Sequence, residues 1–316
     1  MTDHHANDHS HSHEHSHAHH HDHAPASFGR AFAVGISLNI AFVLAEVIYG
    51  LKAQSLALLS DAGHNLGDVL SLLLSWGAIA LSQRRPSSRF TYGLRGSTIL
   101  AALFNAALLL AVMGGIAWEA MHRIVNPVAV EGGVVIGVAA LGVAINTATA
   151  LLFMAGRKRD LNIRAAFQHM AADAAISFGV VLAGVGIVYS GWLWLDPAVS
   201  LVLVGAVILG TWGLLRDAAN LALHAVPAGV EPAEVRTYLA GLPGVSQVHD
   251  LHIWGMSTTE SALTVHLVMP AGYPGDAYIC EIARSLHNRF HIGHPTIQVE
   301  TGDPNHPCVL EPDHVV

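Results

Sequence analysis

Two histidine–aspartate pairs with the same spacing stand inside long apolar runs of this chain. The first is His64 with Asp68, and the second is His169 with Asp173. Residues four apart share a helix face, and ionisable side chains inside an apolar helix usually serve a function. Two neutral imidazoles and two carboxylates can form a tetrahedral set that suits Zn²⁺ and balances one divalent charge. The pattern predicts a metal site between two helices, and the alternative is two structural polar pairs that join them.

The composition is typical of a membrane protein. The 316 residues are 52% apolar and 12% charged, with a mean hydropathy of +0.46. That charged share is about half of the ~25% usual in soluble domains. The net charge of −8 comes without a basic patch, so we expect no nucleic-acid partner. Cys280 and Cys308 give no disulfide framework, and the polar N-terminus does not have the pattern of a secretory signal.

Six apolar blocks are each near or above the length of about 20 residues that crosses a bilayer. Ten Lys and Arg residues flank these blocks on the side of the two termini and the even-numbered loops, against two on the opposite side. The positive-inside rule therefore predicts a multi-pass protein of the cell (inner) membrane with both termini in the cytoplasm. The expected helices are 32–51, 56–82, 97–121, 130–155, 162–189 and 194–218.

The periodicity changes after the last apolar block. The order helix 231–242, strands 245–256 and 260–269, helix 273–290 and strand 296–300 predicts a small α+β domain, ferredoxin-like (αββαβ) and cytoplasmic. The segment before the first apolar block is His-rich, which is typical of metal-binding tracts, although an expression tag is the alternative. The predicted organisation is therefore a disordered His-rich tail (1–27), a six-helix transmembrane bundle (28–223), the cytoplasmic domain (224–302) and a C-terminal tail (303–316).

Five motifs carry a specific resemblance. SLALLSDAGHNLGD, HMAAD, VHDLHIW, VHLV and HPTIQVE follow one another on the expected elements. The chain resembles the cation diffusion facilitator family, in the zinc-type branch that includes bacterial cobalt–zinc–cadmium efflux proteins and animal zinc transporters. The resemblance covers nearly all of residues 28–302. It implies a homodimer with six membrane helices and a ferredoxin-like cytoplasmic domain in each protomer, which exports divalent metal against protons.

Site residues follow from the resemblance position by position. The two His–Asp pairs match the family's transport site. Gln298 replaces a His of some relatives, which puts their binuclear cytoplasmic cluster in doubt. A structural role for one of the cytoplasmic histidines is the alternative to a ligand role. The implied metal ligands of the cytoplasmic domain are His249, His266, His294 and Glu300.

Several further polar residues have two readings. Asp61 lies on the His64 face and is expected to relay protons or metal, or else to be a hydrated acid near the helix end. Glu46 is expected to line the cavity with Asn39, and a direct ligand role is the alternative. His252 is expected to pack in the domain or to serve as a ligand. Cys308 is expected either to be a free thiol or to form a ligand patch with two tail histidines, His306 and His314.

The loop after the second apolar block departs from the family pattern. The sequence SQRRPSSRFTYGLRGST holds no His and no acid, so we expect the second metal site of some relatives to be absent. Many relatives have Arg-x-Glu after the Tyr92-Gly93 position, whereas this chain has Gly96 and Thr98 there and Arg95 is displaced by one residue. We therefore expect the charge clamp that this stretch supports in relatives to be altered.

The functional hypothesis is a proton-coupled efflux antiporter of Zn²⁺, with Co²⁺, Cd²⁺ and Ni²⁺ as further candidates. Imidazole in both pairs favours zinc over manganese or iron. A membrane-bound metal sensor or buffer is the alternative, and it explains the histidines but leaves the aspartates of the apolar runs without a role. An intramembrane metalloprotease needs a motif such as His-Glu-x-x-His with an open metal position. The sequence contains no such motif, so we do not expect an enzyme.

Overall fold

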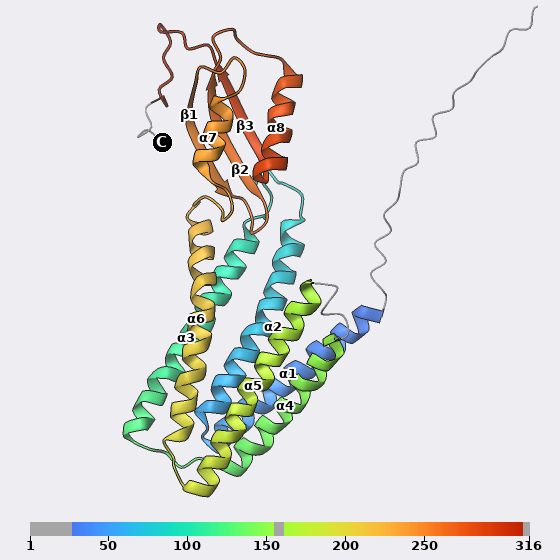
Figure 1. Ribbon diagram of the computed structural model, residues 1–316, viewed down its shortest axis with the longest axis vertical. Helices are drawn as coiled ribbons and strands as arrows, with labels where there is room; N and C mark the ends of the chain where they lie inside the picture. Colours follow the sequence, from blue (N-terminus) through green and yellow to red (C-terminus); the bar gives the residue numbers. More distant parts are fainter. Residues whose placement is uncertain (1–26, 155–160, 312–316) are drawn as a thin grey trace, which may run out of the picture.

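The computed structural model describes residues 27–154 and 161–311. The predicted His-rich tail, apart from its last residue, and His314 lie outside the described residues. Figure 1 shows an elongated helical bundle with a small α+β domain at one end. The bundle helices are α1 (Ser27–Ala53), α2 (Leu56–Ser82), α3 (Ser97–Val125), α4 (Gly132–Met154), α5 (Leu161–Ser190) and α6 (Leu195–Ala222).

Five of the described helices are long and apolar enough to cross a membrane. They are α2, α3, α4, α6 and the Phe167–Ser190 part of α5. All the bundle helices begin and end within a few residues of the predicted blocks. Many of their large apolar side chains face outwards, as expected for helices surrounded by lipid.

Two glycines let α2 approach α3 closely. A Cβ on Gly63 would lie 2.6 Å from Met113 Cε, and one on Gly67 would lie 3.0 Å from both Leu109 Cδ atoms. Small residues four apart allow this kind of close helix packing in membranes. Because His64 and Asp68 each directly follow one of these glycines, the α2–α3 contact fixes the helix that carries the first pair.

Asp196 in the first turn of α6 caps the start of α2. Its buried carboxylate accepts hydrogen bonds from the backbone N–H groups of Leu56 (2.7 Å) and Ala57 (3.3 Å) and from the Ser55 hydroxyl (2.5 Å). These groups would otherwise lack partners, because the first turn of a helix has no intrahelical acceptors. The cap fixes the position of α2 along its axis relative to α6, and sequence reasoning did not identify it.

The C-terminal domain follows the predicted αββαβ order. Its elements are α7 (Pro232–Ala240), β1 (Gln247–Gly255), β2 (Ser261–Val268), α8 (Asp276–Phe290) and β3 (Ile292–Glu300). The sheet order is β1-β2-β3, with β1 antiparallel and β3 parallel to β2. Both helices pack on the sheet around one apolar core. The last strand begins four residues earlier than predicted, because an edge strand tolerates Pro295.

The loop between α2 and α3 contacts the C-terminal domain. Arg95 forms an ion pair with Glu260 in the β1–β2 turn. In the first turn of α3, Thr98 Oγ1 accepts a hydrogen bond from the backbone N–H of Thr258 at 3.1 Å. The ring of Tyr92 meets the ring of His294 edge-on, with centroids 5.5 Å apart. The displaced Arg95 therefore has an acidic partner, and the segment that directly follows α2 joins the bundle to the domain.

Candidate metal centre

The two His–Asp pairs meet where α2 approaches α5. His64 Nε2 lies 3.3 Å from Asp173 Oδ1 and 3.8 Å from Asp68 Oδ2. His169 Nε2 lies 3.2 Å from Asp68 Oδ2 and 3.7 Å from Asp173 Oδ2. The four side chains therefore form a closed ring in which imidazole nitrogens and carboxylate oxygens alternate, and each contact between the two helices joins unlike groups.

Three members of this ring have the mutual spacing of a metal site. Zinc ligands lie about 2.0–2.2 Å from the metal, so neighbouring corners of a tetrahedron are about 3.3–3.6 Å apart. The four N···O distances of the ring, 3.2–3.8 Å, bracket that range. Asp68, His169 and Asp173 each offer a ligand atom within 4.8 Å of the others. His64 contacts both carboxylates but lies outside this group, with its ring centroid 6.1 Å from that of His169, so its side chain would have to move to complete a tetrahedral set.

The ring is more exposed on the side nearer the C-terminal domain and more closed on the other side. Asp68 and His169, which lie nearer that domain along their helices, have side chains 34% and 45% exposed, whereas Asp173 is 3% exposed. A cavity of about 280 Å³ reaches His64 and Asp68 between α2, α3 and α6. It is lined on its polar side by Ser71, Asn105 and Thr211. The more exposed members of the ring are therefore those nearer the C-terminal domain.

Two buried acids stand on the closed side of the ring. Asp61 Oδ2 accepts a hydrogen bond from the Ser177 hydroxyl at 3.0 Å, and Glu46 Oε2 accepts one from Asn65 Nδ2 at 3.0 Å. Each carboxyl group also has one buried oxygen without a hydrogen-bond partner. Because Asp61 is only 1% exposed, the alternative of a hydrated acid at the helix end is wrong for this conformation.

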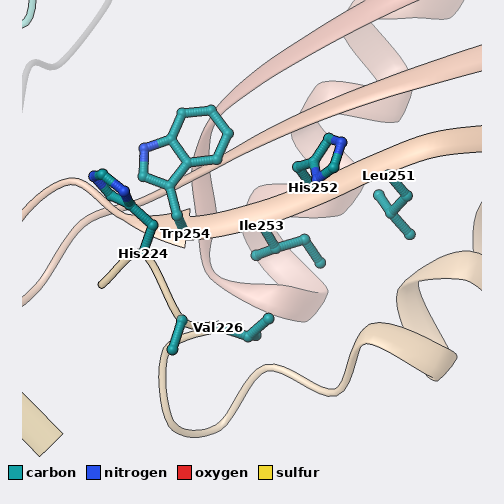
Figure 2. Close-up of a pocket in the computed structure, with 7 residues that line it drawn as sticks. His224, Val226, Leu251, His252, Ile253 and Trp254 are labelled. Atoms are coloured by element: carbon teal, nitrogen blue, oxygen red, sulfur yellow. The ribbon is translucent and has the colours of Figure 1, made fainter. Parts of the chain in front are cut away.

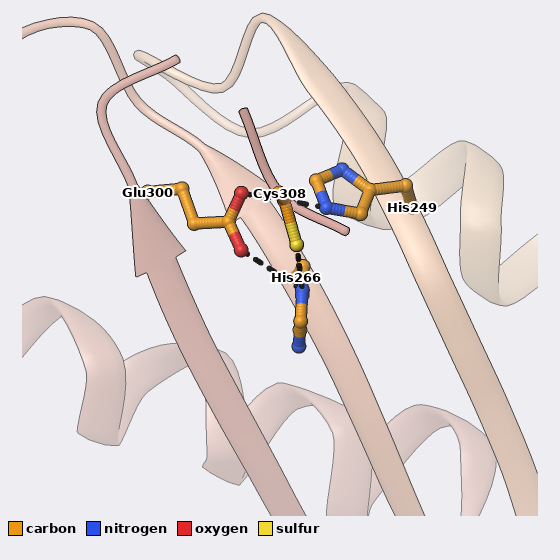
Figure 3. A group of neighbouring side chains, drawn as sticks. All are labelled: His249, His266, Glu300 and Cys308. Carbon is orange, nitrogen blue, oxygen red and sulfur yellow. Dashed lines mark hydrogen bonds and ion pairs between the residues drawn. The ribbon is translucent and has the colours of Figure 1, made fainter. Parts of the chain in front are cut away.

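A second cluster of possible ligands lies on the sheet of the C-terminal domain (Figure 3). His266 Nδ1 is 2.9 Å from Glu300 Oε1, and His249 Nε2 is 3.4 Å from Glu300 Oε2. The antiparallel register pairs His249 directly with His266. Cys308 of the tail completes the group, with Sγ 3.6 Å from His266 Nδ1. The sequence left open a free thiol or a ligand patch with the tail histidines for this cysteine, because nothing in the spacing shows that the tail turns back.

The structure does not bring His294 to this cluster. It lies six residues before Glu300 on β3, about 20 Å away at ~3.3 Å per residue, and contacts Tyr92 instead. Gln298 donates from Nε2 to Glu300 Oε1 at 2.8 Å. His306 Nδ1 lies 3.0 Å from Asp303 Oδ2, and this hydrogen bond lowers the pKa of Asp303. His294 and His306 therefore have other partners within the described part of the chain.

A further pocket of about 580 Å³ lies between the end of α6 and β1. Figure 2 shows His224 beside Trp254 and His252 farther along the strand, among apolar neighbours. His252 Nε2 lies 2.9 Å from Asp250 Oδ1, which favours a supporting role over a ligand role. The pocket residues include no acid and no cysteine, so the two histidines there do not make a charge-balanced metal site.

Comparisons with known proteins agree with this architecture. Residues 32–221 match the family model described as the cation efflux transmembrane domain, and residues 227–302 match that of the cation efflux protein cytoplasmic domain. The chain is 36% identical to the metal cation efflux system protein CzcD of Cupriavidus metallidurans, over 87% of this chain and 88% of that protein. It is 35% identical to the zinc transporter ZitB of Escherichia coli, over 85% and 86% of the two chains.

Two other similarities extend this comparison. The cadmium, cobalt and zinc/H(+)-K(+) antiporter of Bacillus subtilis is 30% identical over 88% of this chain and 90% of its own length. A solved structure, the metal-bound C-terminal domain of the CzcD transporter from Cupriavidus metallidurans, is 38% identical and covers 22% of this chain and 99% of that one, with a TM-score of 0.21.

The apolar helices and the matched domains define a multi-pass membrane protein of a transporter class. The chain belongs to the cation efflux family, the cation diffusion facilitators. The predicted resemblance is thereby confirmed.

Proposed function

We propose that this protein is a proton-coupled antiporter that exports divalent transition metal from the cytoplasm. Zn²⁺ is the first candidate substrate, and Co²⁺, Cd²⁺ and Ni²⁺ belong to the same class. The observation that carries the proposal is the ring of His64, Asp68, His169 and Asp173, whose alternating N and O atoms make four contacts of 3.2–3.8 Å between two membrane helices. Its two imidazoles favour zinc over harder ions.

Proton coupling follows from the chemistry of these donors. An imidazole or carboxylate binds either a proton or a metal ion, so metal binding releases protons. If the ring opens alternately to the two sides of the membrane, protons entering from outside displace the metal there. The deprotonated ring then takes up metal again from the cytoplasm. The relatives named as a zinc transporter and as a cadmium, cobalt and zinc/H(+)-K(+) antiporter support this type of exchange.

The direction of access supports an inward-open state. The distribution of Lys and Arg favours a cytoplasmic position for the C-terminal domain and both termini, in an inner membrane. The cavity that reaches His64 and Asp68 extends towards that domain as far as Ser71 and Leu214, while the buried acids Asp61 and Glu46 lie on the opposite side. In this arrangement the ring receives cytoplasmic metal, and the acids lie on the exit path, where they relay protons or metal.

The proposed assembly is a homodimer. Each protomer contributes six spans, with α1 as the first, and a ferredoxin-like cytoplasmic domain. The match to the cytoplasmic domain of the family supports the dimer. Within that domain we propose His249, His266 and Glu300 as ligands of a regulatory metal ion. His294 is not included among these ligands, because its ring contacts Tyr92 instead.

Transport by purified protein in liposomes tests the proposal. Vesicles with an imposed pH gradient and an enclosed zinc-sensitive dye should show zinc movement that depends on the gradient. The double variant His64→Ala with Asp173→Ala should abolish that movement, and Ser71→Ala, which changes a cavity residue outside the ring, should preserve it. Zinc movement by the double variant at the parent rate would refute the assignment.

The cytoplasmic cluster gives weight to one alternative, a membrane-bound metal sensor or buffer without transport. Deleting residues 1–23 separates the two functions. A buffer loses a large part of its binding capacity with those eleven histidines, whereas an antiporter still moves metal across the vesicle membrane.

A further inference from the structure

The C-terminal tail turns back over the sheet after β3. Gly302 makes the turn with φ = 72°, and a Cβ there would lie 2.8 Å from Val268 Cγ1. A residue with a side chain is disfavoured on both counts. Farther along, Glu311 accepts a hydrogen bond from Gln247 Nε2 at 3.3 Å. The turn and this contact hold Cys308 over the middle of the His–Glu cluster (Figure 3).

The cluster has unsatisfied donor atoms that point to a ligand. His249 is 2% exposed and makes no hydrogen bond: its Nδ1 has no partner, and its Nε2 only faces Glu300 Oε2 at 3.4 Å. An unpartnered buried polar group costs about 1–3 kcal/mol. One ligand atom each from His249, His266, Glu300 and Cys308 lies within 4.8 Å of the others. These four donors come from β1, β2, β3 and the tail, one from each, and they surround one position.

Asp250 orients one of these ligands. His266 Nε2 faces Asp250 Oδ2 at 3.4 Å, while Nδ1 faces Glu300 and Cys308. Asp250 has φ = 49° and lies in the irregularity of β1 between His249 and His252. A carboxylate that holds one ring N–H leaves the other nitrogen free to bind a metal, as in carboxylate–histidine–metal triads. The backbone of β1 therefore directs the Nδ1 lone pair of His266 into the cluster.

We propose that Cys308 is the fourth ligand of a tetrahedral metal site formed with His249, His266 and Glu300, and that metal binding fastens the C-terminal tail to the sheet. When the Sγ–metal bond forms, the thiol proton leaves to water. The resulting thiolate and the Glu300 carboxylate balance one divalent cation. A thiolate selects Zn²⁺, Cd²⁺ or Co²⁺ over Mg²⁺, Ca²⁺ and Mn²⁺. The site deepens the regulatory role proposed above and is independent of transport by the membrane ring.

Cobalt absorption tests this site, because a cobalt–thiolate bond gives a charge-transfer band in the near ultraviolet. The full chain in detergent is titrated with Co²⁺. Neither the membrane ring nor the His-rich tail contains a cysteine, so a cobalt–thiolate band reports only Cys280 or Cys308. We expect the band in the parent, its loss in Cys308→Ser, and its retention in the matched control Cys280→Ser, which changes the other, exposed cysteine.

Affinity and exchange measurements extend the test. Loss of even an outer-sphere partner weakens metal sites about 10–100-fold, so Cys308→Ser should weaken cobalt binding at this site at least ~10-fold. Cys308→His should restore the affinity without the band, which excludes misfolding as the cause. Cobalt should slow hydrogen exchange of backbone amides in residues 303–311 of the parent but not of Cys308→Ser.

The outcomes distinguish this proposal from the transport proposal. A parent without the band, a band that persists in Cys308→Ser, or a band lost in Cys280→Ser would each overturn the Cys308 site. Tail exchange that cobalt leaves unchanged in the parent would overturn the fastening of the tail. The His64→Ala, Asp173→Ala variant should keep the band whether or not it still transports zinc, because the ring and the cluster are separate groups of ligands.

Discussion

His64 Nε2 lies 3.3 Å from Asp173 Oδ1, although 109 positions separate the two residues in the chain. The contact joins α2 to α5 at the ring, where the two helices meet only over a short stretch. It pairs the imidazole of one His–Asp motif with the carboxylate of the other. The two motifs therefore act as one group of donors, and a change in any member should affect the whole ring.

Asp173→Asn should weaken zinc binding to the ring at least ~10-fold, since loss of a supporting group alone costs about 10–100-fold. Asparagine keeps the shape of the side chain but removes one of the two negative charges. Calorimetric titration of protein that lacks residues 1–23 avoids heat from the His-rich segment. Ser71→Ala is the control from the same cavity, and equal affinities of parent and Asp173→Asn would exclude this residue as a ligand.

Zinc affinity of the ring should fall as the pH falls. Protons compete for imidazole and carboxylate, and free imidazole titrates near pH 6.5. Each proton displaced per metal ion changes the apparent affinity about tenfold per pH unit, once the pH is below the pKa of the group concerned. Binding titrations at a series of pH values in detergent measure this slope. An affinity independent of pH would contradict proton coupling at this site.

Asp196→Ala should destabilise the bundle by about 2–4 kcal/mol, which combines the loss of a helix cap with buried donors left unpaired. The substitution leaves Leu56 N–H, Ala57 N–H and the Ser55 hydroxyl without their acceptor. Asp217→Ala changes an exposed acid on the same helix and is the matched control. Thermal unfolding in detergent compares the two, and similar midpoints would show that the cap is dispensable.

Charge reversal tests the joint between bundle and domain. Arg95→Glu alone, or Glu260→Arg alone, places like charges together at the ion pair and should lower the rate of zinc transport. The double reversal should restore it. Both side chains are more than 40% exposed, so the pair contributes no more than about 1 kcal/mol to stability. A transport rate that is the same in all three variants would show that the joint is not needed for the cycle.

The elements that sequence predicted well are those set by local patterns. Apolar blocks gave the bundle helices to within a few residues, and alternating residues gave β1 and β2. The repeated His-x-x-x-Asp spacing identified the residues that α2 and α5 bring together. Their role as metal ligands remains a prediction, as do the number of spans and the ferredoxin-like class of the domain.

What the sequence could not show depends on contacts between distant segments. Asp196 caps α2 from 140 positions away, and no local signal indicates that pairing. Cys308 reaches the cluster because Gly302 reverses the chain, a turn that a single glycine does not specify. His294 lies in the matching motif, yet its place at the start of β3 directs it to Tyr92. Position along a strand decided that outcome more than residue type.

The contact of the α2–α3 loop with the β1–β2 turn connects the movement of α2 to that of the C-terminal domain. His64 and Asp68 lie in the half of α2 that is farther from the domain. The loop after α2 contacts Glu260 through Arg95, and the first turn of α3 contacts Thr258 through Thr98. A tilt of the C-terminal domain would therefore move two corners of the ring against the two on α5. Small changes in the N···O edges would then alter how tightly an ion is held. Fastening or releasing the tail on the sheet would in this way change the metal affinity of the ring in the membrane.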